Sequence, residues 1–309
     1  MSLASFNESI FSDYLAGQKA LLPNLPDIQK VTPRVTRVLG ANPGQFQLQG
    51  TNTYIVGSGR ERILVDTAQG EPEWIKFISS ALEAGGYRIS HVLLTHWHWD
   101  HTGGVPDLIT LYPELSSAIY KNHPDNGQLP IEDGQVFKVE GATVRAVHTP
   151  GHAYDHMCFV LEEENALFTG DNVLGHGYTV VEDLGLFTTS LDVMENQKCK
   201  IGYPAHGDVI ADLPTTIAQY KGQQVRRERQ IIMALKRSRE QQKQEGSRHK
   251  GSATVREIVM AVYGDVTEEV SKLALEPYTN EVLMKLAQDQ KVGFQFQRGS
   301  KRWFLSALA

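Results

Sequence analysis

Short apolar runs separated by turn-forming residues occupy most of the chain from residue 34 to residue 206. Such runs predict strands, and the Gly, Asn and Pro residues between them mark where each strand ends. We expect strands at residues 35–39, 52–56, 63–65, 89–94, 118–121, 142–148, 157–161, 166–170 and 200–203. Helical spacing predicts helices at residues 72–84, 106–112 and 188–195. This succession predicts an α/β protein in which two sheets pack together and are covered by helices.

The last third of the chain has a different pattern. A long polar helix is expected from residue 215 to about 244, followed by a linker at 245–247. The next helix starts at a capping box formed by Thr254 and Glu257. A second helix through Val282 and Leu286 and a hairpin at 294–305 follow it. Helices followed by a hairpin resemble a winged-helix unit. We therefore expect a catalytic domain at 1–214, with a lead-in containing a short helix at 1–33, a basic helix and linker at 215–247, and a winged-helix-like domain at 248–309.

The composition is that of an ordinary globular protein. With 309 residues and 41% hydrophobic content, the chain can bury a large core. No apolar run approaches the roughly 20 residues of a membrane span, and the first residues lack the apolar region of a secretory signal. Cys158 and Cys199 cannot build a disulfide framework and are expected to be buried small side chains. We therefore expect a cytoplasmic protein that does not bind a membrane.

The charge is unevenly distributed along the chain. The net charge is −6, but residues 221–250 hold ten Lys or Arg against three acids, a local +7 that leaves −13 for the rest. A basic helix in this region can follow RNA phosphates, dock an acidic protein surface, or simply be a solvated face. The sequence leaves these three alternatives open.

A cluster of histidines follows the strand expected at residues 89–94. His96 and His98 alternate in an extended segment, so their side chains can share a face. The turn that follows brings Asp100 and His101 to a second position. Three His and one Asp within six positions are costly at the end of a buried strand unless they bind a cation. One short loop can therefore supply ligands to two neighbouring metals.

Three further residues with ligand chemistry follow later strands. His152 ends the segment Thr-Pro-Gly-His, Asp171 stands in Thr-Gly-Asp-Asn, and His206 stands in Pro-Ala-His-Gly. A glycine beside each lets the backbone turn closely around a cation. Each residue alone is consistent with an ordinary turn, but together with the first cluster they predict a metal centre.

This set of residues resembles that of the metallo-β-lactamase superfamily, over roughly residues 34–212. The resemblance implies an αββα sandwich with two Zn²⁺ ions at one edge, with Mn²⁺ or Fe as possible substitutes. It implies that His96, His98 and His152 bind one metal, that Asp100, His101 and His206 bind the second, and that Asp171 bridges them. It also implies that Asp66, at the end of its strand, supports the ligands without binding metal.

Two such metals lower the pKa of a shared water and polarise the atom under attack, so the expected reaction is hydrolysis, with Asp100 and Asp171 at the catalytic centre. Residues 48–54, 103–107 and 169–177 look like two groups of the superfamily. One group is the fungal thioesterases that release aromatic polyketides, such as atrochrysone carboxylic acid, from the acyl carrier protein of a non-reducing polyketide synthase. The other is the animal β-lactamase-like RNA endonucleases.

Residues 40–44 and 69–74 look more like the fungal group, whereas Ala205 and Tyr178 depart from the usual pattern beside the expected site. A thiolate with a pKa of about 8.5 leaves with little acid assistance, whereas an RNA 5′-oxygen needs more. We therefore expect a thioesterase whose partners are the acyl carrier protein and its aromatic polyketide thioester. The alternative is a single-stranded RNA endonuclease, and only then is nucleic acid a partner.

Three aromatic residues near the ligands have two interpretations each. His176 follows Asp171 in the same segment and is expected either to contact the substrate or its oxyanion, or to make a structural hydrogen bond. Trp97 and Trp99 are expected either to line an aromatic cleft or to pack against the sandwich. A further interpretation, in which the site is structural and the protein is a binding module, is disfavoured by the complete set of ligand-type residues.

Overall fold

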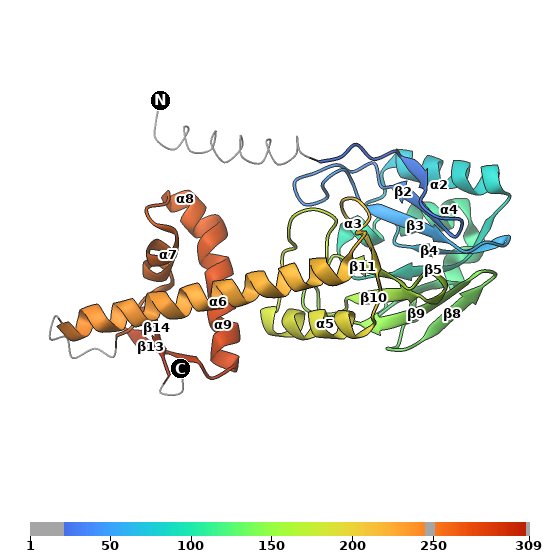
Figure 1. The fold of residues 1–309 in the computed structure, drawn as a ribbon. Coiled ribbons are helices and arrows are strands. Elements are labelled where there is room, and N and C mark those ends of the chain that lie inside the picture. Colours follow the sequence, from blue (N-terminus) through green and yellow to red (C-terminus); the bar gives the residue numbers. More distant parts are fainter. Residues whose placement is uncertain (1–21, 245–250, 307–309) are drawn as a thin grey trace, which may run out of the picture. The chain divides into compact units, whose positions relative to one another are not determined.

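The computed structural model describes residues 22–244 and 251–306 (Figure 1). The chain divides into two compact units, residues 1–218 and residues 219–309. The short helix expected before residue 22 and the linker expected at 245–247 lie outside the described residues. None of the described helices combines the length and the apolar composition that crossing a bilayer requires.

The first unit contains a seven-stranded sheet with strand order β1-β2-β3-β4-β5-β6-β7. The strands are β1 (Ile28–Lys30), β2 (Val35–Leu39), β3 (Asn52–Val56), β4 (Glu61–Val65), β5 (Arg88–Leu94), β6 (Ile119–Lys121) and β7 (Leu129–Pro130). Neighbours from β1 to β4 run antiparallel. Neighbours from β4 to β7 run parallel, so β4, β5 and β6 all end at the same edge of the sheet.

A second sheet of five strands has the order β12-β11-β10-β9-β8. Its strands are β8 (Val136–Val139), β9 (Ala142–His148), β10 (Met157–Leu161), β11 (Ala166–Gly170) and β12 (Ile201–Pro204). The strands from β8 to β11 form an antiparallel meander. Only β11 and β12 are parallel neighbours, and α5 (Leu184–Asn196) lies between them in the chain.

The two sheets pack face to face over an apolar core. Tyr54 on β3, Phe168 on β11 and Tyr203 on β12 form an aromatic cluster with ring centroids 5.1–5.7 Å apart. Side chains alternate along each strand, so Ile55 and Leu64 belong to a separate apolar cluster on the outer face of the first sheet. Both faces of the central strands are therefore buried, which explains why residues 63–65 of β4 and 92–94 of β5 form continuous apolar runs.

Helices cover the outer face of the first sheet. They are α2 (Pro72–Gly85), α4 (Val105–Leu111) and the 3₁₀ turn η1 (Pro113–Ser117). Trp74, Ile78 and Leu82 recur at helical spacing and form the buried stripe of α2. Pro72 begins this helix and Gly86, with φ of 62°, ends it in the left-handed conformation.

The second sheet is accompanied by α5, which runs beside it in Figure 1. Asp183 caps this helix by accepting the Leu186 N–H at 2.9 Å. Phe187 and Leu191 are buried, and the Ser190 hydroxyl donates to the Pro150 carbonyl at 2.6 Å. The first unit is thus a two-sheet sandwich flanked by helices, and the predicted α/β class is confirmed.

The second unit contains most of one long helix and a small group of further elements. These are α6 (Leu213–Gln244), which starts in the first unit, α7 (Val255–Tyr263), α8 (Glu268–Val270), the π-helical turn η3 (Ser271–Leu275), α9 (Glu276–Gln288), β13 (Val292–Gln297) and β14 (Ser300–Leu305). The predicted capping box is present, since Thr254 Oγ1 accepts the Glu257 N–H and the Glu257 carboxylate accepts the Thr254 N–H. Val282, Leu286 and Trp303 lie in the core of this unit.

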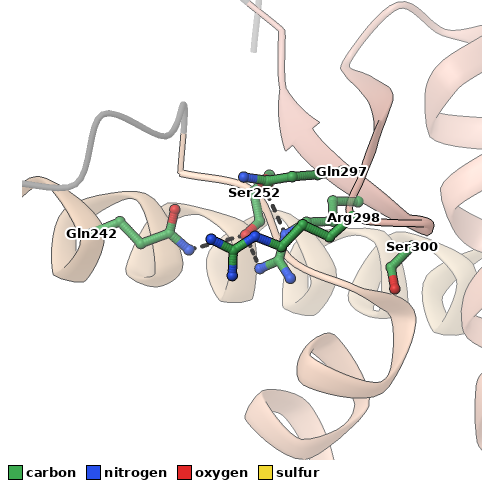
Figure 2. Close-up of a pocket in the computed structure, with 6 residues that line it drawn as sticks. Gln242, Ser252, Gln297, Arg298 and Ser300 are labelled. Atoms are coloured by element: carbon green, nitrogen blue, oxygen red, sulfur yellow. Dashed lines mark hydrogen bonds between the residues drawn. The ribbon is translucent and has the colours of Figure 1, made fainter.

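A polar cavity of about 360 Å³ opens between α6 and the β13–β14 hairpin (Figure 2). Gln242, Ser252, Gln297, Arg298, Ser300 and Arg302 line it. Arg302 is held in place by the Ser252 carbonyl at 2.7 Å and by the Glu257 carboxylate at 2.8 Å. Gln242 Nε2 also donates to the Ser252 carbonyl, at 3.0 Å. Internal hydrogen bonds therefore occupy the Arg302 guanidinium and Gln242 Nε2, whereas Gln242 Oε1 is buried without a partner among the described residues.

The predicted strand bounds agree closely with the structure. The bounds of β2, β3, β9, β10 and β11 are those predicted. The short strands β1, β7 and β8 were not predicted, because their residues are largely exposed and have no apolar run. The helix predicted at 188–195 begins earlier, at Leu184, because Asp183 caps it before its apolar spacing becomes regular.

Phe159→Ala tests the inter-sheet core. Phe159 is fully buried among both sheets, so its truncation should reduce the free energy of unfolding by about 3–5 kcal/mol. Chemical denaturation followed by circular dichroism measures this. Leu111→Ala, at an exposed position on α4, is the matched control and should cost less than about 1 kcal/mol. Equal losses in the two variants would contradict the assigned core.

Candidate metal centre

Parallel strand pairs in both sheets end at the predicted ligands. Asp66 follows β4 and Thr95 follows its parallel neighbour β5, while Asp171 follows β11 and the His206 segment follows its parallel neighbour β12. The seven predicted ligand residues meet here in three overlapping groups whose ligand atoms lie within 4.8 Å of one another. The groups are His96, His98 and His152; His96, His101 and Asp171; and Asp100, His101 and His206.

Three imidazoles form the first group. His96 Nε2, His98 Nδ1 and His152 Nε2 lie 2.9–3.2 Å from one another. The outer nitrogen of His152, Nδ1, donates to the Val180 carbonyl at 2.7 Å, which leaves a lone pair on Nε2. His96 Nδ1 contacts Thr95 Oγ1 at 2.9 Å. These outer contacts turn the inner nitrogens toward a common point.

Two carboxylates join the remaining imidazoles. His206 Nε2 lies 3.2 Å from Asp171 Oδ1 and 3.4 Å from Asp100 Oδ2. His101 Nε2 lies 3.6 Å from Asp171 Oδ2 and 3.7 Å from Asp100 Oδ2. Asp171 Oδ2 also lies 3.5 Å from His152 Nε2. The Asp171 carboxylate therefore reaches both groups.

These residues fit divalent metal ions. The buried atoms His101 Nε2 and Asp171 Oδ1 have no hydrogen-bond partner among the described residues, which is costly unless something else binds them. Nitrogens that bind one tetrahedral zinc at about 2.1 Å lie about 3.4 Å apart, close to the spacing in the first group. Imidazole and carboxylate ligands suit zinc, manganese and iron.

The electrostatics of the site favour a cation between the carboxylates. Burial lowers the pKa of His152 and lowers that of His96 well below 6.5, so both imidazoles are neutral. Burial also opposes charge on His206, but the Asp171 and Asp100 carboxylates outweigh it and raise its pKa to about 9. Against the effect of burial, His206 and His101 hold the pKa of Asp171 well below its usual value. This carboxylate therefore remains ionised.

Residues 47–206, just over half of the chain, match the family described as the Metallo-beta-lactamase superfamily. The chain belongs to this superfamily. The matched span contains all seven of the converging residues.

Relatives in the metallo-beta-lactamase superfamily share most of the sequence. "Atrochrysone carboxyl ACP thioesterase" from Aspergillus chevalieri is 62% identical over 97% of this chain and 96% of that protein. "Lactamase-like protein adaB" from Aspergillus niger is 58% identical over 97% of this chain and 94% of its own length. "Atrochrysone carboxyl ACP thioesterase dmxR1" from Cryptosporiopsis sp. is 56% identical over 99% and 95%.

Solved structures share the fold at low identity. A beta-lactamase domain protein from Burkholderia ambifaria aligns with a TM-score of 0.71 and 17% identity, over 94% of this chain and all of that one. A metallo-beta-lactamase family protein from Thermus thermophilus aligns with a TM-score of 0.64 and 22% identity, over 89% and 100%. Both alignments extend beyond the sandwich of this superfamily member into its C-terminal unit.

Asp66 is a hydrogen-bonding partner of the predicted ligand His101 and of Thr95. Its Oδ2 lies 2.9 Å from His101 Nδ1, and its Oδ1 accepts the Thr95 N–H at 2.8 Å. One buried carboxylate therefore orients an imidazole and also holds the end of β5. Such partners fix the tautomer and direction of a metal-binding His.

Side chains of β3 hold the loop that carries His206. Asn52 Nδ2 donates to the carbonyls of Pro204 and Gly207 at 2.8 and 2.7 Å. The Tyr54 hydroxyl donates to the Pro204 carbonyl at 2.7 Å. These bonds explain why a polar Asn and Tyr stand in a fully buried strand.

The sequence analysis missed two buried polar residues beside the predicted ligands, His156 and Asp155. His156 Nε2 accepts the Asp171 N–H at 3.1 Å, and its Nδ1 lies 3.0 Å from Thr149 Oγ1. Asp155 accepts from Lys121 Nζ at 3.0 Å and from the Trp97 N–H, between two predicted ligands, at 3.3 Å. The only available signal was their position next to the apolar run of β10, which does not reveal their partners.

Of the other predicted site residues, Trp97 and His176 lie on loops and Trp99 begins α3 (Trp99–Thr102). His176 is half-buried in the loop after Asp171, and this loop is held by a 2.9 Å hydrogen bond from the Gly175 N–H to the His206 carbonyl. Trp97 and Trp99 are exposed, so neither packs into the sandwich core. The Trp97 ring lies edge-on to His98, with centroids 4.4 Å apart.

Asp66→Asn tests the supporting carboxylate. The amide cannot stabilise His101 as the carboxylate does, so zinc affinity should fall about 10- to 100-fold. Competition with a chromogenic chelator measures the affinity. Asp107→Asn, at an exposed position on α4, removes the same charge and should leave zinc affinity unchanged. Unchanged affinity in Asp66→Asn would rule out this role.

Lys121→Met tests the buried ion pair. Both Lys121 and Asp155 are almost fully buried, so removal of the ammonium leaves an unpaired carboxylate and should destabilise the fold by about 3–5 kcal/mol. Thermal unfolding at neutral pH measures the loss. Lys76→Met removes a lysine from an exposed pair with Glu73 and should change stability by less than about 1 kcal/mol.

Proposed function

We propose that this chain is a thioesterase that releases an aromatic polyketide acid from the acyl carrier protein of a non-reducing polyketide synthase. The observation that carries the proposal is identity of 53–62%, over at least 97% of this chain, to relatives named atrochrysone carboxyl ACP thioesterase. The convergence of seven His and Asp side chains at one sandwich edge supports a hydrolytic centre in the same region.

We propose a dinuclear zinc centre, for which manganese or iron are substitutes. His96, His98 and His152 would hold one metal, Asp100, His101 and His206 the other, and Asp171 both. When bound, the metals lower the pKa of a shared water and polarise the thioester carbonyl. The released thiolate has a pKa of about 8.5 and needs no protonation by the chain to depart.

Exposure of the ligands indicates the side from which the substrate arrives. The side chains of His98 and Asp100 are 28% and 15% exposed, whereas His96 and His101 are buried. Gln47, from the loop between β2 and β3, donates to Asp100 Oδ2 at 3.1 Å. We infer that the acyl group approaches along this side.

Exposed aromatic rings adjoin Gln47 and the predicted ligands His98 and Asp100 in sequence. Phe46 precedes Gln47, Trp97 precedes His98 and Trp99 precedes Asp100, and all three rings are exposed. Exposed aromatic side chains favour contact with a flat aromatic substrate. We propose that they bind the polyketide, and that His176 contacts its thioester oxygen.

The C-terminal elements and the two cysteines also fit the proposed function. We propose that α7, η3 and α9 followed by the β13–β14 hairpin form a winged-helix-like domain at 248–309, joined to the catalytic domain at 1–214 by the basic helix and linker at 215–247. Cys158 and Cys199 are free and buried, in keeping with a cytoplasmic thioesterase.

A paired assay tests the function. Zinc-loaded protein should release the free polyketide acid from an acyl carrier protein thioester, and chelation should abolish release until zinc is returned. Single-stranded RNA should remain intact under the same conditions. Mass spectrometry of the acid and gel analysis of the RNA provide the measurements. RNA cleavage without acid release would assign the chain to the alternative, an endonuclease.

A variant in the same assay distinguishes hydrolysis at the candidate metal centre from hydrolysis by a contaminating enzyme. Asp171→Asn should reduce acid release to background and lower zinc content, because Asp171 reaches both groups of ligands. Asp107→Asn is the charge-matched control and should retain full release. Full activity in Asp171→Asn would show that the reaction occurs elsewhere.

A further inference from the structure

One side of α6 within the C-terminal unit is exposed and rich in cations. The cationic face consists of Val225, Arg226, Arg229, Met233, Lys236 and Arg237, all of them exposed. Their spacing of three, four and seven residues places them along one side of the helix. Ile231, Ala234 and Leu235 occupy the opposite side and are buried.

The charges of the cationic face are unpaired within the described part of the chain. Arg226, Arg229, Lys236 and Arg237 form no ion pair with another described residue. By contrast, Glu228 on another side of the same helix is bound by both Lys285 and Lys291. Glu240 is the one acid that extends the exposed face at the helix end. Acids exist in this unit, but they do not neutralise the cationic face.

Apolar side chains lie among these cations. Val225 is 65% exposed and Met233 is 46% exposed, and each is close along the helix to Arg229. A mixture of arginine with exposed Val and Met is typical of protein interfaces, which have an apolar centre and a polar rim. Single-stranded RNA, in contrast, binds basic surfaces that also offer aromatic rings for stacking. The cationic face contains no aromatic residue.

We propose that the cationic face docks an acidic helical surface of the acyl carrier protein, an inference that rests on the proposed function for the choice of partner. Asp and Glu on the partner would pair with Arg226, Arg229, Lys236 and Arg237, and apolar side chains between them would cover Val225 and Met233. Complementary charge of this kind speeds association and selects the partner.

Charge reversal at the centre of the cationic face tests the docking. The probe is a phosphopantetheinylated acyl carrier protein domain of a non-reducing polyketide synthase, titrated into the zinc-loaded full-length chain by calorimetry. Arg229→Glu with Lys236→Glu should weaken binding about 10- to 100-fold. Arg60→Glu with Lys138→Glu makes the same charge change at exposed positions of the sandwich and should leave binding within about twofold of the unaltered chain.

Measurements of kcat/KM distinguish an effect on docking from an effect on the hydrolytic reaction. In the helix variant, kcat/KM for the carrier-bound thioester should fall to the same extent as binding, while kcat/KM for the small N-acetylcysteamine thioester of the same acid stays unchanged. Equal weakening in both double variants, no weakening in the helix variant, or loss of small-thioester hydrolysis would each overturn the proposal. The proposal would also be overturned if the helix variant retained less single-stranded RNA than the unaltered chain while its binding to the carrier domain was unchanged. If the unaltered chain binds the carrier domain through this face but releases no acid, the proposed function fails and the docking surface remains.

Discussion

Seven ionisable side chains share one edge of the sandwich, and the cost of burying them there constrains the surrounding structure. Two parallel strand pairs, β4 with β5 and β11 with β12, end at this edge, so the loops that follow these strands lie close together. Each buried charge costs several kcal/mol unless it is compensated. Imidazoles placed between Asp100 and Asp171 satisfy this requirement only in part, because His101 Nε2 and Asp171 Oδ1 have no hydrogen-bond partner among the described residues. Divalent cations would complete the compensation.

A second layer of buried polar groups makes this convergence rigid. Hydrogen bonds of Asp66 connect His101 to the end of β5, and a hydrogen bond of Asn52 connects the His206 loop to β3. The Asp155 carboxylate links Lys121 on β6 to the backbone between His96 and His98. Each of these hydrogen bonds joins segments that are distant in sequence. Displacement of residues 96–101 or of the His206 loop therefore breaks a hydrogen bond in the interior of the sandwich.

The parts of this structure that the sequence predicts are those determined locally. Apolar runs bounded by turn residues predict β9 and β10 to the residue, because both the run and its ends are visible in the chain. Ligand chemistry is likewise visible in the spacing of His96, His98 and Asp100. The role of Asp155 is not visible, because its partner Lys121 comes from a strand 34 residues earlier. Start positions of helices such as α5 are missed where a cap precedes the regular pattern.

The charge distribution places the proposed docking of a carrier protein and the proposed hydrolysis on different parts of the chain. The chain outside residues 221–250 carries −13 against a local +7, so an acidic partner is repelled by most of the protein. Screening limits that repulsion to about 8 Å at physiological salt, and within this distance the nearest charges decide the outcome. Unpaired cations concentrated on one exposed helix face can therefore attract an acidic surface despite the overall negative charge. Because these cations are exposed and most of the predicted ligand side chains are buried, the proposed recognition surface can change in evolution without disturbing the buried charges of the candidate metal centre.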